Sequence, residues 1–443
     1  MKNNFIIFSR GFNELDMILP FIDYVLIKCK DNVTLYTSLK NIPGANCHLD
    51  YLRTNYHLEQ KYFIYEKCFS KYRYILLLYD KIKQFREKKG GGKNIRYISY
   101  MISIISLIMT RVVEYVIRKP IKRFVDELNI SDKIVIYFSG ETVFPCNAIV
   151  KFAKKRNIQT VGFFQAFYLY SNLQYTVKSI DKESIRARIA NYIGRSERQY
   201  CTYYLVGKSM KNTFLRSSGN VGFNKMDRVF ETATPRYTKG WTNKFRAFLM
   251  KRGQFNYGDE KKTNVVFFLS QVKQNVDLKK FINLLHTLSG LNNINFVYKP
   301  HTRGSHKSEI DAICSSFGFN KSVINGYDGS HINSMLLSGW ADVGIVFGSS
   351  IAIQLLIDNV PIIVPTFVHT NSTILEKHKI CITANSLDEL INILANNTKD
   401  DIRKLIDNAR VKEFLNKYLD ANKDYEQIMR EYYESVVNNK LVK

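Results

Sequence analysis

The second half of the chain contains three short segments whose residue types bind phosphate. They combine an ammonium, an imidazole and a guanidinium group with a glycine, hydroxyl groups and an amide. The residues concerned are Lys299, His301, Arg303, Gly348, Ser349, Ser350, Ser270 and Gln271. A glycine that leads into a helix start binds anions through free backbone amides, and nearby cations balance the anion's charge. Helix capping also explains the serines taken alone, and a bond within its own loop explains His301. Their occurrence after neighbouring strands favours a phosphate site.

Two carboxylates in the first half of the chain are candidates for proton transfer. Glu141 follows an expected strand at 133–138, and Glu14 follows an expected strand at 4–8 and a turn at 9–11. Glu141 would face a cleft between domains, where a carboxylate can accept a proton from a substrate hydroxyl, and Glu14 is the rival candidate for this role. Each is equally explained as an acidic residue near the start of a helix. The sequence leaves both candidates open.

The elements that position the phosphate-binding segments alternate regularly. Short apolar strands are expected at 263–270, 295–298, 322–325, 342–347, 361–365 and 380–383. Helices are expected at 276–291, 307–317, 330–338, 351–358, 386–395 and 400–419. This alternation predicts a parallel sheet covered on both faces, and such sheets bind ligands beyond the carboxyl ends of their strands. The candidate residues fall at those ends.

The first half shows a weaker version of the same pattern. Strands are expected at 4–8, 33–37, 133–138, 160–165 and 201–206, and helices at 15–22, 145–156 and 209–217. A long helical region at 61–128 reads as an insertion. The fold class is therefore α/β, with two Rossmann-like domains facing a cleft. We expect an N-terminal domain at 1–218, a basic linker at 219–262, a C-terminal domain at 263–420, and a last helix at 421–443 that crosses back.

Composition and charge narrow the function classes. The 443 residues include 65 Lys+Arg and 39 Asp+Glu, a net charge of +26, and a 45% hydrophobic content excludes general disorder. The seven cysteines are scattered without CxxC pairs, which predicts a reducing compartment and no structural zinc. The N-terminus lacks a signal-peptide pattern, which predicts a cytoplasmic protein. A nucleic-acid partner is not expected, because no RRM, KH or zinc-knuckle signature occurs.

Most of the excess charge lies in two stretches. Residues 81–123 hold 12 basic and 2 acidic residues, and residues 186–252 hold 15 basic and 3 acidic residues. The first stretch surrounds an apolar run at 98–109, which is shorter than the ~20 residues that cross a bilayer. Apolar, aromatic and basic residues in this order favour peripheral binding to an anionic membrane surface. A long buried helix with solvated ends is the alternative.

The strand-end motifs resemble those of a known group of enzymes. A Lys-Pro-His loop at 299–301, a strand ending in Gly-Ser-Ser at 348–350, and Pro-Ile-Ile-Val-Pro at 361–365 are similar to the donor domain of GT-B-fold transferases that build bacterial surface polysaccharides. These include Kdo- and sialyltransferases and CDP-glycerol glycerophosphotransferases. The resemblance covers residues 262–395, and it implies that His301, Ser349 and Ser350 contact the phosphate of a nucleotide donor.

Two positions depart from the pattern of that group. Pro300 precedes His301, whereas the proline of the group's motif follows the histidine. In the first half, 161–165 (VGFFQ) is similar to a second motif of the same enzymes, but Ala166-Phe167 stand where those have His-Gly. The resemblance therefore assigns no catalytic histidine there. Some Kdo transferases place their base after the first strand, which is the position of Glu14.

The resemblance implies a glycosyltransferase. It would move a sugar from a CMP-, CDP- or UDP-linked donor to a capsule, lipopolysaccharide or lipid-linked acceptor, on the inner face of the cell membrane. The leaving phosphate would be stabilised by His301, Arg303 and the serine pair. No DxD triplet follows a strand, so we expect neither a metal nor another cofactor. The alternatives are a polyol-phosphate transferase of teichoic-acid type, a sugar-nucleotide epimerase, and a basic RNA-binding or scaffold protein.

Overall fold

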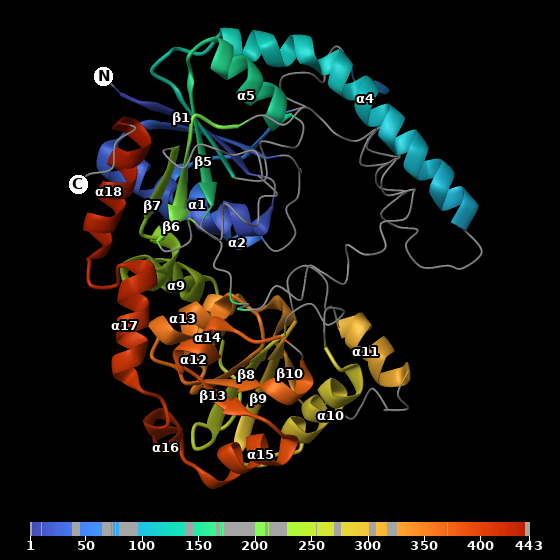
Figure 1. Ribbon diagram of the computed structural model, residues 1–443, viewed down its shortest axis with the longest axis vertical. Coiled ribbons are helices and arrows are strands. Elements are labelled where there is room, and N and C mark those ends of the chain that lie inside the picture. Colours follow the sequence, from blue (N-terminus) through green and yellow to red (C-terminus); the bar gives the residue numbers. More distant parts are fainter. Residues whose placement is uncertain are drawn as a thin grey trace.

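The computed structural model covers two α/β domains (Figure 1). It describes the chain except for residues 1, 10, 38–44, 64–71, 73, 76, 79–95, 138–144, 165–168, 170, 172–199, 209–210, 212–227, 254, 270–275, 301–306, 317–325, 370 and 439–443.

The first domain is built on a parallel sheet of seven strands in the order β3-β2-β1-β4-β5-β6-β7. The strands are β1 (Asn4–Ser9), β2 (Asn32–Thr37), β3 (Lys61–Tyr62), β4 (Lys133–Tyr137), β5 (Gln159–Phe164), β6 (Tyr203–Gly207) and β7 (Val229–Thr232). In register, Ile7 of β1 pairs with Leu35 of β2 and with Val135 of β4. Every central strand is an apolar run because both faces of the sheet are covered.

Alternate residues of β1 point to the two covering layers. Phe5 and Ile7 pack with the helices α1 (Phe12–Tyr24) and α2 (Asn46–Tyr56). Ile6 and Phe8 pack with α4 (Arg96–Asp126) and α5 (Cys146–Lys155). The period-two alternation of a strand thus builds a hydrophobic core on each face of the sheet.

The second domain holds a parallel sheet of six strands in the order β10-β9-β8-β11-β12-β13. The strands are β8 (Thr263–Phe268), β9 (Ile294–Lys299), β10 (Tyr327–Asp328), β11 (Val343–Val346), β12 (Ile362–Pro365) and β13 (Ile382–Ala384). One face packs against α10 (Leu278–Ser289), α11 (Lys307–Ser316) and α15 (Leu387–Asn396). The other face packs against α12 (Ser334–Trp340), α13 (Ile351–Ile357) and α14 (Ile374–His378).

The segments between and after the two sheets join the domains. Residues 219–262, for which the sequence predicts a linker, contribute β7 to the first sheet and then form the short 3₁₀ helix η5 (Pro235–Tyr237) and α9 (Lys239–Arg252). The C-terminal helices α16 (Lys399–Lys404), α17 (Asn408–Leu419) and α18 (Tyr425–Asn438) run from the second domain back to the first (Figure 1). There α18 lies against α1 and β6, and the Tyr203 hydroxyl donates to the Val436 carbonyl at 2.6 Å.

One predicted helix is divided in two. The helix expected at 400–419 ends as α16 at Lys404 and begins again as α17 at Asn408. Asp407 caps the second piece, because its carboxylate accepts hydrogen bonds from the amides of Ala409 and Arg410. A capping aspartate stabilises a new helix start and so competes with continuation of the preceding helix.

Both sheets reverse their strand order at one place. The reversal lies between β1 and β4 in the first sheet and between β8 and β11 in the second. Two parallel sheets covered by helices confirm the predicted fold class. None of the helices that the structure describes combines the length and apolar character that crossing a bilayer requires.

Candidate functional site

The carboxyl ends of the strands in the two sheets face each other across the domain boundary. After β5 and β12, the Ile374 amide donates to the Leu169 carbonyl at 2.7 Å, and the Ser171 amide donates to the Ser372 carbonyl at 2.9 Å. Ligands of open α/β sheets bind beyond these ends, at the point where the strand order reverses. The domain boundary is therefore the candidate functional site.

Lys299 is the last residue of β9 and lies at this boundary. Its side chain is 6% exposed, and Nζ donates to the Ser330 carbonyl at 2.9 Å. Burial lowers the pKa of Lys299 to about 8, against the opposing charges of Asp328 and Cys47. Cys47 belongs to the first domain, so the charges that act on the Lys299 ammonium come from both domains. The neighbouring candidates His301 and Arg303 lie outside the described residues.

The Gly-Ser-Ser segment connects β11 to α13 as predicted from the sequence pattern. Gly348 has φ +69°, a left-handed conformation that favours glycine. Ser350 is exposed, and as the N-cap of α13 its side chain accepts no capping hydrogen bond within that helix. The hydroxyl of Ser350 instead interacts with Tyr237 of η5. Gly348 and Ser349 lie just beyond the carboxyl end of β11, and Ser270 and Gln271, which follow β8, are outside the described residues.

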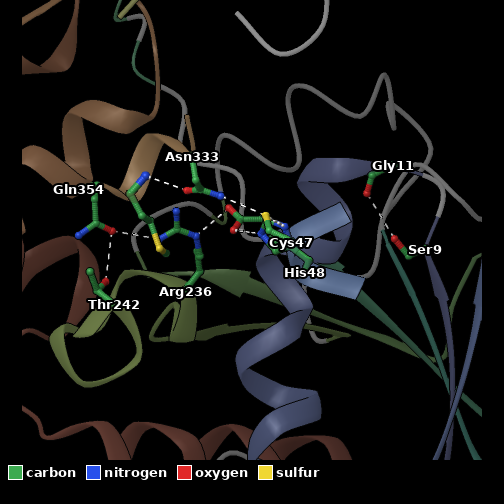
Figure 2. Close-up of polar contacts among 10 residues, drawn as sticks. Ser9, Gly11, Cys47, His48, Arg236, Thr242, Asn333 and Gln354 are labelled. Atoms are coloured by element: carbon green, nitrogen blue, oxygen red, sulfur yellow. Dashed lines mark hydrogen bonds and ion pairs between the residues drawn. The ribbon is translucent and has the colours of Figure 1, made fainter. Parts of the chain in front are cut away.

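The two candidate carboxylates follow the strands that flank the reversal of the first sheet. Glu14 lies in the first turn of α1, directly after β1, and its side chain is 7% exposed. Between β1 and α1, the Ser9 hydroxyl donates to the Gly11 carbonyl at 3.4 Å (Figure 2). Glu141 lies four residues beyond the end of β4, outside the described residues. The topology brings the ends of β1 and β4 together.

A buried polar network at the boundary was not predicted from the sequence. Arg236 of η5 donates from Nε to Asp16 of α1 at 2.7 Å and from Nη1 to Gln354 of α13 at 3.0 Å. On the far side of Asp16, its carboxylate contacts Nε2 of His48 in α2 at 2.9 Å. Figure 2 shows Arg236 between Gln354 of the second domain and the His48 region of the first. Through η5 of the connecting segment, the network ties α1 and α2 of the first domain to α13 of the second.

The charges of this network stabilise one another. Burial alone would raise the pKa of Asp16, but the Arg236 guanidinium and His48 hold it at about 2. Burial alone would lower the pKa of His48, but the charges of Cys47 and Asp16 raise it to about 9. At neutral pH Asp16 is therefore a carboxylate and His48 is an imidazolium. The network can position the helix starts at the boundary, whereas its carboxylate is not free to act as a general base.

The sequence carries weak signals for these residues. Asp16 is a charged residue inside an otherwise apolar helical run, 15–22, where it is not explained by solvation. Arg236 sits between Pro235 and Tyr237 in a segment that reads as linker. An acidic residue on the buried face of a helix requires a partner. Asp16 is therefore the residue whose position in the sequence could have indicated a buried network.

A groove on the surface lies between α2 and α9. It is lined by Asp50, Arg53, Lys244, Lys251 and Arg252, among others. Its cations are engaged in part, because Arg252 pairs with Asp50 at 2.8 Å and Lys244 pairs with Asp23 at 2.7 Å. None of the predicted phosphate-binding residues lines it. Within the described part of the chain, no group of His, Cys, Asp and Glu side chains is arranged to hold a metal ion.

Comparison with known proteins identifies the fold. No protein-family model and no curated protein sequence matches the chain. The UDP-GlcNAc 2-epimerase from Neisseria meningitidis, bound to UDP-GlcNAc, aligns over 99% of this chain and 100% of its own, with TM-score 0.52 and 11% identity. The UDP-GlcNAc 2-epimerase from Methanocaldococcus jannaschii aligns over 94% and 98%, with TM-score 0.50 and 13% identity. The glycotransferase of kitacinnamycin aligns over 98% and 100%, with TM-score 0.51 and 10% identity. The chain has a two-domain α/β fold of GT-B type, as the sequence predicted.

Proposed function

We propose that the protein is a nucleotide-sugar-dependent glycosyltransferase that acts on a capsule, lipopolysaccharide or lipid-linked acceptor. The observation that carries this proposal is the meeting of the carboxyl ends of both sheets at one boundary, with the buried ammonium of Lys299 beside it. The fold is shared with a UDP-GlcNAc 2-epimerase whose structure holds UDP-GlcNAc, and with the glycotransferase of kitacinnamycin. The same boundary would hold the donor here.

Lys299 would bind a phosphate of the donor. Its lowered pKa means that the buried ammonium is under-compensated by the charges around it. A diphosphate placed beside it would favour the charged form and would gain a charge-assisted hydrogen bond. The turn at Gly348, Ser349 and Ser350 would contribute amides and hydroxyls. The strand-end residues His301, Arg303, Ser270 and Gln271 complete the proposed set.

The reaction would be displacement at the activated sugar carbon. Glu14 or Glu141 would take the proton of the acceptor hydroxyl as the new bond forms, and the nucleotide phosphate would leave. Cations at the carboxyl end of β9, and the amides and hydroxyls of the turn after β11, would stabilise the charge that develops on the leaving phosphate. This assignment of roles requires no metal ion.

The nucleotide part of the proposal is tested by binding. We expect one of CMP, CDP, UDP, GDP or TDP to raise the melting temperature of the protein, because a ligand at 100 times its Kd stabilises the folded state by about 2.7 kcal/mol. Lys299→Met should weaken that nucleotide's binding at least about tenfold, the effect of losing one charge-assisted bond. Lys279→Met, on the exposed side of α10, is the matched control and should bind normally. Absence of stabilisation by every nucleotide would contradict the proposal.

An epimerase is the second candidate, favoured by the names of two similar structures. Incubation with UDP-GlcNAc separates the two reactions. An epimerase converts the sugar while it remains linked to UDP, whereas a transferase releases UDP once an acceptor is supplied. A polyol-phosphate transferase would instead be selective for CDP in the binding panel and would release CMP from a CDP-linked polyol.

The acceptor side of the proposal rests on α4. The helix reaches out beyond the first domain (Figure 1). Ile105, Ile108, Val112 and Tyr115 are 43%, 55%, 40% and 79% exposed, and their spacing of three, four and three residues places them on one face. On the opposite face, the side chain of Ile121 is buried in the core. We propose that the outward face lies on an anionic membrane.

The charge on α4 also favours contact with an anionic membrane. Lys119 and Lys122 continue the row of Ile105 to Tyr115 at the same helical spacing, and both are exposed. Apolar side chains that insert between headgroups and lysines that reach anionic lipids are the two parts of an interfacial helix. A bilayer that carries a lipid-linked acceptor would thus be held next to the first domain.

Vesicle flotation tests this surface. We expect the protein to float with vesicles that contain phosphatidylglycerol, and to release them as salt rises, because ions screen the lysines. Ile108→Glu should abolish flotation. Ile130→Glu, at a residue that is 69% exposed but lies outside α4, should not. Equal flotation of both variants, or none by the unmodified protein, would refute the assignment.

A further inference from the structure

Cys47 stands out among the cysteines by its surroundings. It is the second residue of α2, partly exposed, at the domain boundary. Its Sγ lies 3.3 Å from Nδ1 of His48, and Nδ2 of Asn333 in the second domain donates to it at 3.2 Å. Figure 2 shows Cys47 and His48 on one side of this contact and Asn333 on the other.

The three groups Cys47, His48 and Asp16 form a line. His48 contacts Cys47 through Nδ1, and through Nε2 it contacts Asp16 at 2.9 Å. An imidazole within reach of a thiol, and itself oriented by a carboxylate, is the arrangement that activates nucleophilic cysteines. Arg236 in turn holds Asp16 at 2.7 Å, so the carboxylate that orients the imidazole is fixed in place.

Charge around the sulfur agrees with this geometry. Burial alone would raise the pKa of Cys47, and Asp16 opposes ionisation too. The charge of His48 and the hydrogen bonds from His48 and Asn333 outweigh both, and the pKa of the thiol is lowered. Lys299, whose pKa responds to Cys47 and to Asp328, adds a second cation nearby. The imidazolium, the lysine and the amide group all favour the thiolate.

Other partly exposed cysteines have the opposite environment. Burial and the charge of Asp31 raise the pKa of Cys29 to about 11. Burial and the charge of Glu376 raise the pKa of Cys381 to about 12. Because thiolates, not thiols, are the reactive species, these two cysteines serve as internal controls in the same chain.

We propose that Cys47 is a nucleophilic thiol, modified selectively by peroxides and alkylating electrophiles, and that its modification breaks the contact between α2 and α12. With hydrogen peroxide, the thiolate sulfur attacks one oxygen, an S–O bond forms and the O–O bond breaks. The sulfur is oxidised to a sulfenic acid. The second oxygen of the peroxide leaves as hydroxide and takes the electron pair of the broken O–O bond. The site needs no nucleotide sugar to react.

The contact with Asn333 explains why modification reaches the second domain. Asn333 is the N-cap of α12, and its Oδ1 accepts from the Met335 amide at 2.9 Å, which leaves Nδ2 directed at the sulfur. An oxygen or a carbamidomethyl group added to Sγ would occupy the space that Nδ2 now fills. The start of α12 must then move away from α2.

Labelling with iodoacetamide from pH 5.5 to 9.5, followed by peptide mass spectrometry, tests the reactivity. At pH 7 we expect Cys47 to react at least about tenfold faster than Cys29, since one unit of pKa changes the thiolate fraction about tenfold. After brief exposure to hydrogen peroxide, dimedone should label Cys47 first. A Cys47 rate no greater than that of Cys29, with a midpoint at the ordinary thiol value, would overturn the proposal.

A pair of isosteric variants tests the cause. Asn333→Asp keeps the capping oxygen of α12 but places a carboxylate against Sγ, so alkylation of Cys47 at pH 7 should slow about tenfold. Asn283→Asp, on the exposed side of α10, should leave the rate unchanged. An unchanged rate in folded Asn333→Asp refutes the role of this contact. If that variant does not fold, the pH profile of the unmodified protein decides.

Hydrogen exchange tests the consequence for the domains. Peroxide treatment should increase amide exchange in α12, residues 334–340, and the increase should disappear in Cys47→Ser. Unchanged exchange in α12 of protein that mass spectrometry shows to be modified at Cys47 would refute the proposed break of the contact.

Discussion

Arg236 provides the sharpest test of how the two domains are held together. We expect Arg236→Met to destabilise the folded protein by about 3 kcal/mol at pH 7, the lower end of the cost of leaving one partner of a buried ion pair. The lower end applies because His48 still contacts Asp16 at 2.9 Å. The variant also loses the hydrogen bond to Gln354 at 3.0 Å, which contributes about 1 kcal/mol.

The pKa of Asp16 gives an independent magnitude. It falls from 3.8 to about 2, and at 1.36 kcal/mol per unit the folded environment favours the carboxylate by about 2.5 kcal/mol. Because this pKa is depressed, the stabilisation is present above pH 3.8 and is lost as pH falls through 2. A double-mutant cycle of Arg236→Met with Asp16→Asn should therefore show a coupling of about 2 kcal/mol at pH 7.

Urea unfolding followed by tryptophan fluorescence is the assay. The chain has two tryptophans, and Trp241 is fully buried in α9, next to η5. Arg410→Met is the control, because Arg410 pairs with Asp407 at 3.0 Å on the exposed surface, where such pairs contribute below about 0.5 kcal/mol. A loss in Arg236→Met no larger than that of the control, or additive losses in the cycle, would refute the buried network as the link between the domains.

Three further predictions concern local structure. Gly162→Ala would place a Cβ 2.3 Å from the ring of Tyr204, so it should lower the free energy of unfolding by about 1–3 kcal/mol. Gly253→Ala is the control, because the space around Gly253 is open, and it should change this free energy little. Urea unfolding compares the two variants. Asp277→Ala removes the cap that accepts bonds from two amides of α10, and differential scanning calorimetry should show a loss of about 1 kcal/mol. The pKa of Lys299 in the folded protein is about 8, below its ordinary value of 10.5. The free energy of unfolding should therefore rise by up to about 3 kcal/mol between pH 8 and 10.5 in the unmodified protein, but not in Lys299→Met. An equal rise in both proteins would contradict the burial of Lys299.

Much of the fold was open to prediction from local pattern. Continuous apolar runs such as 4–8 and 263–268 are strands because both faces of a parallel sheet exclude water. Each predicted strand in the described part of the chain begins and ends within a few residues of the observed strand. The break at Asp407 was missed because a polar residue in a long amphipathic pattern resembles one on its solvated face. Only its hydrogen bonds to Ala409 and Arg410 show that it caps.

The candidate site was predicted in part for the same reason. Lys299 and Gly348 follow strands, and the rule that ligands bind beyond strand ends requires no knowledge of partners. The structure places both there. Asp16, His48 and Arg236 were missed, because the partners of Asp16 lie 32 and 220 residues away in the sequence, and no local pattern connects them.

The sequence by itself determined the central strands of the two parallel sheets, most of the helices that cover them and the positions of the strand-end residues, since these follow from short-range periodicity. The edge strands β3 and β7 were not predicted, because they are short and lie in the regions interpreted as a helical insertion and a linker. Tertiary structure alone decided which of the many charges are buried. Asp16 and Arg236 are 220 residues apart, and their pairing at 2.7 Å arises when the domains pack and exclude water. The same packing brings Asn333 to Cys47, 286 residues away, and so turns an ordinary cysteine into one in a charged environment. Such contacts depend on how two folded surfaces meet, which no local pattern encodes.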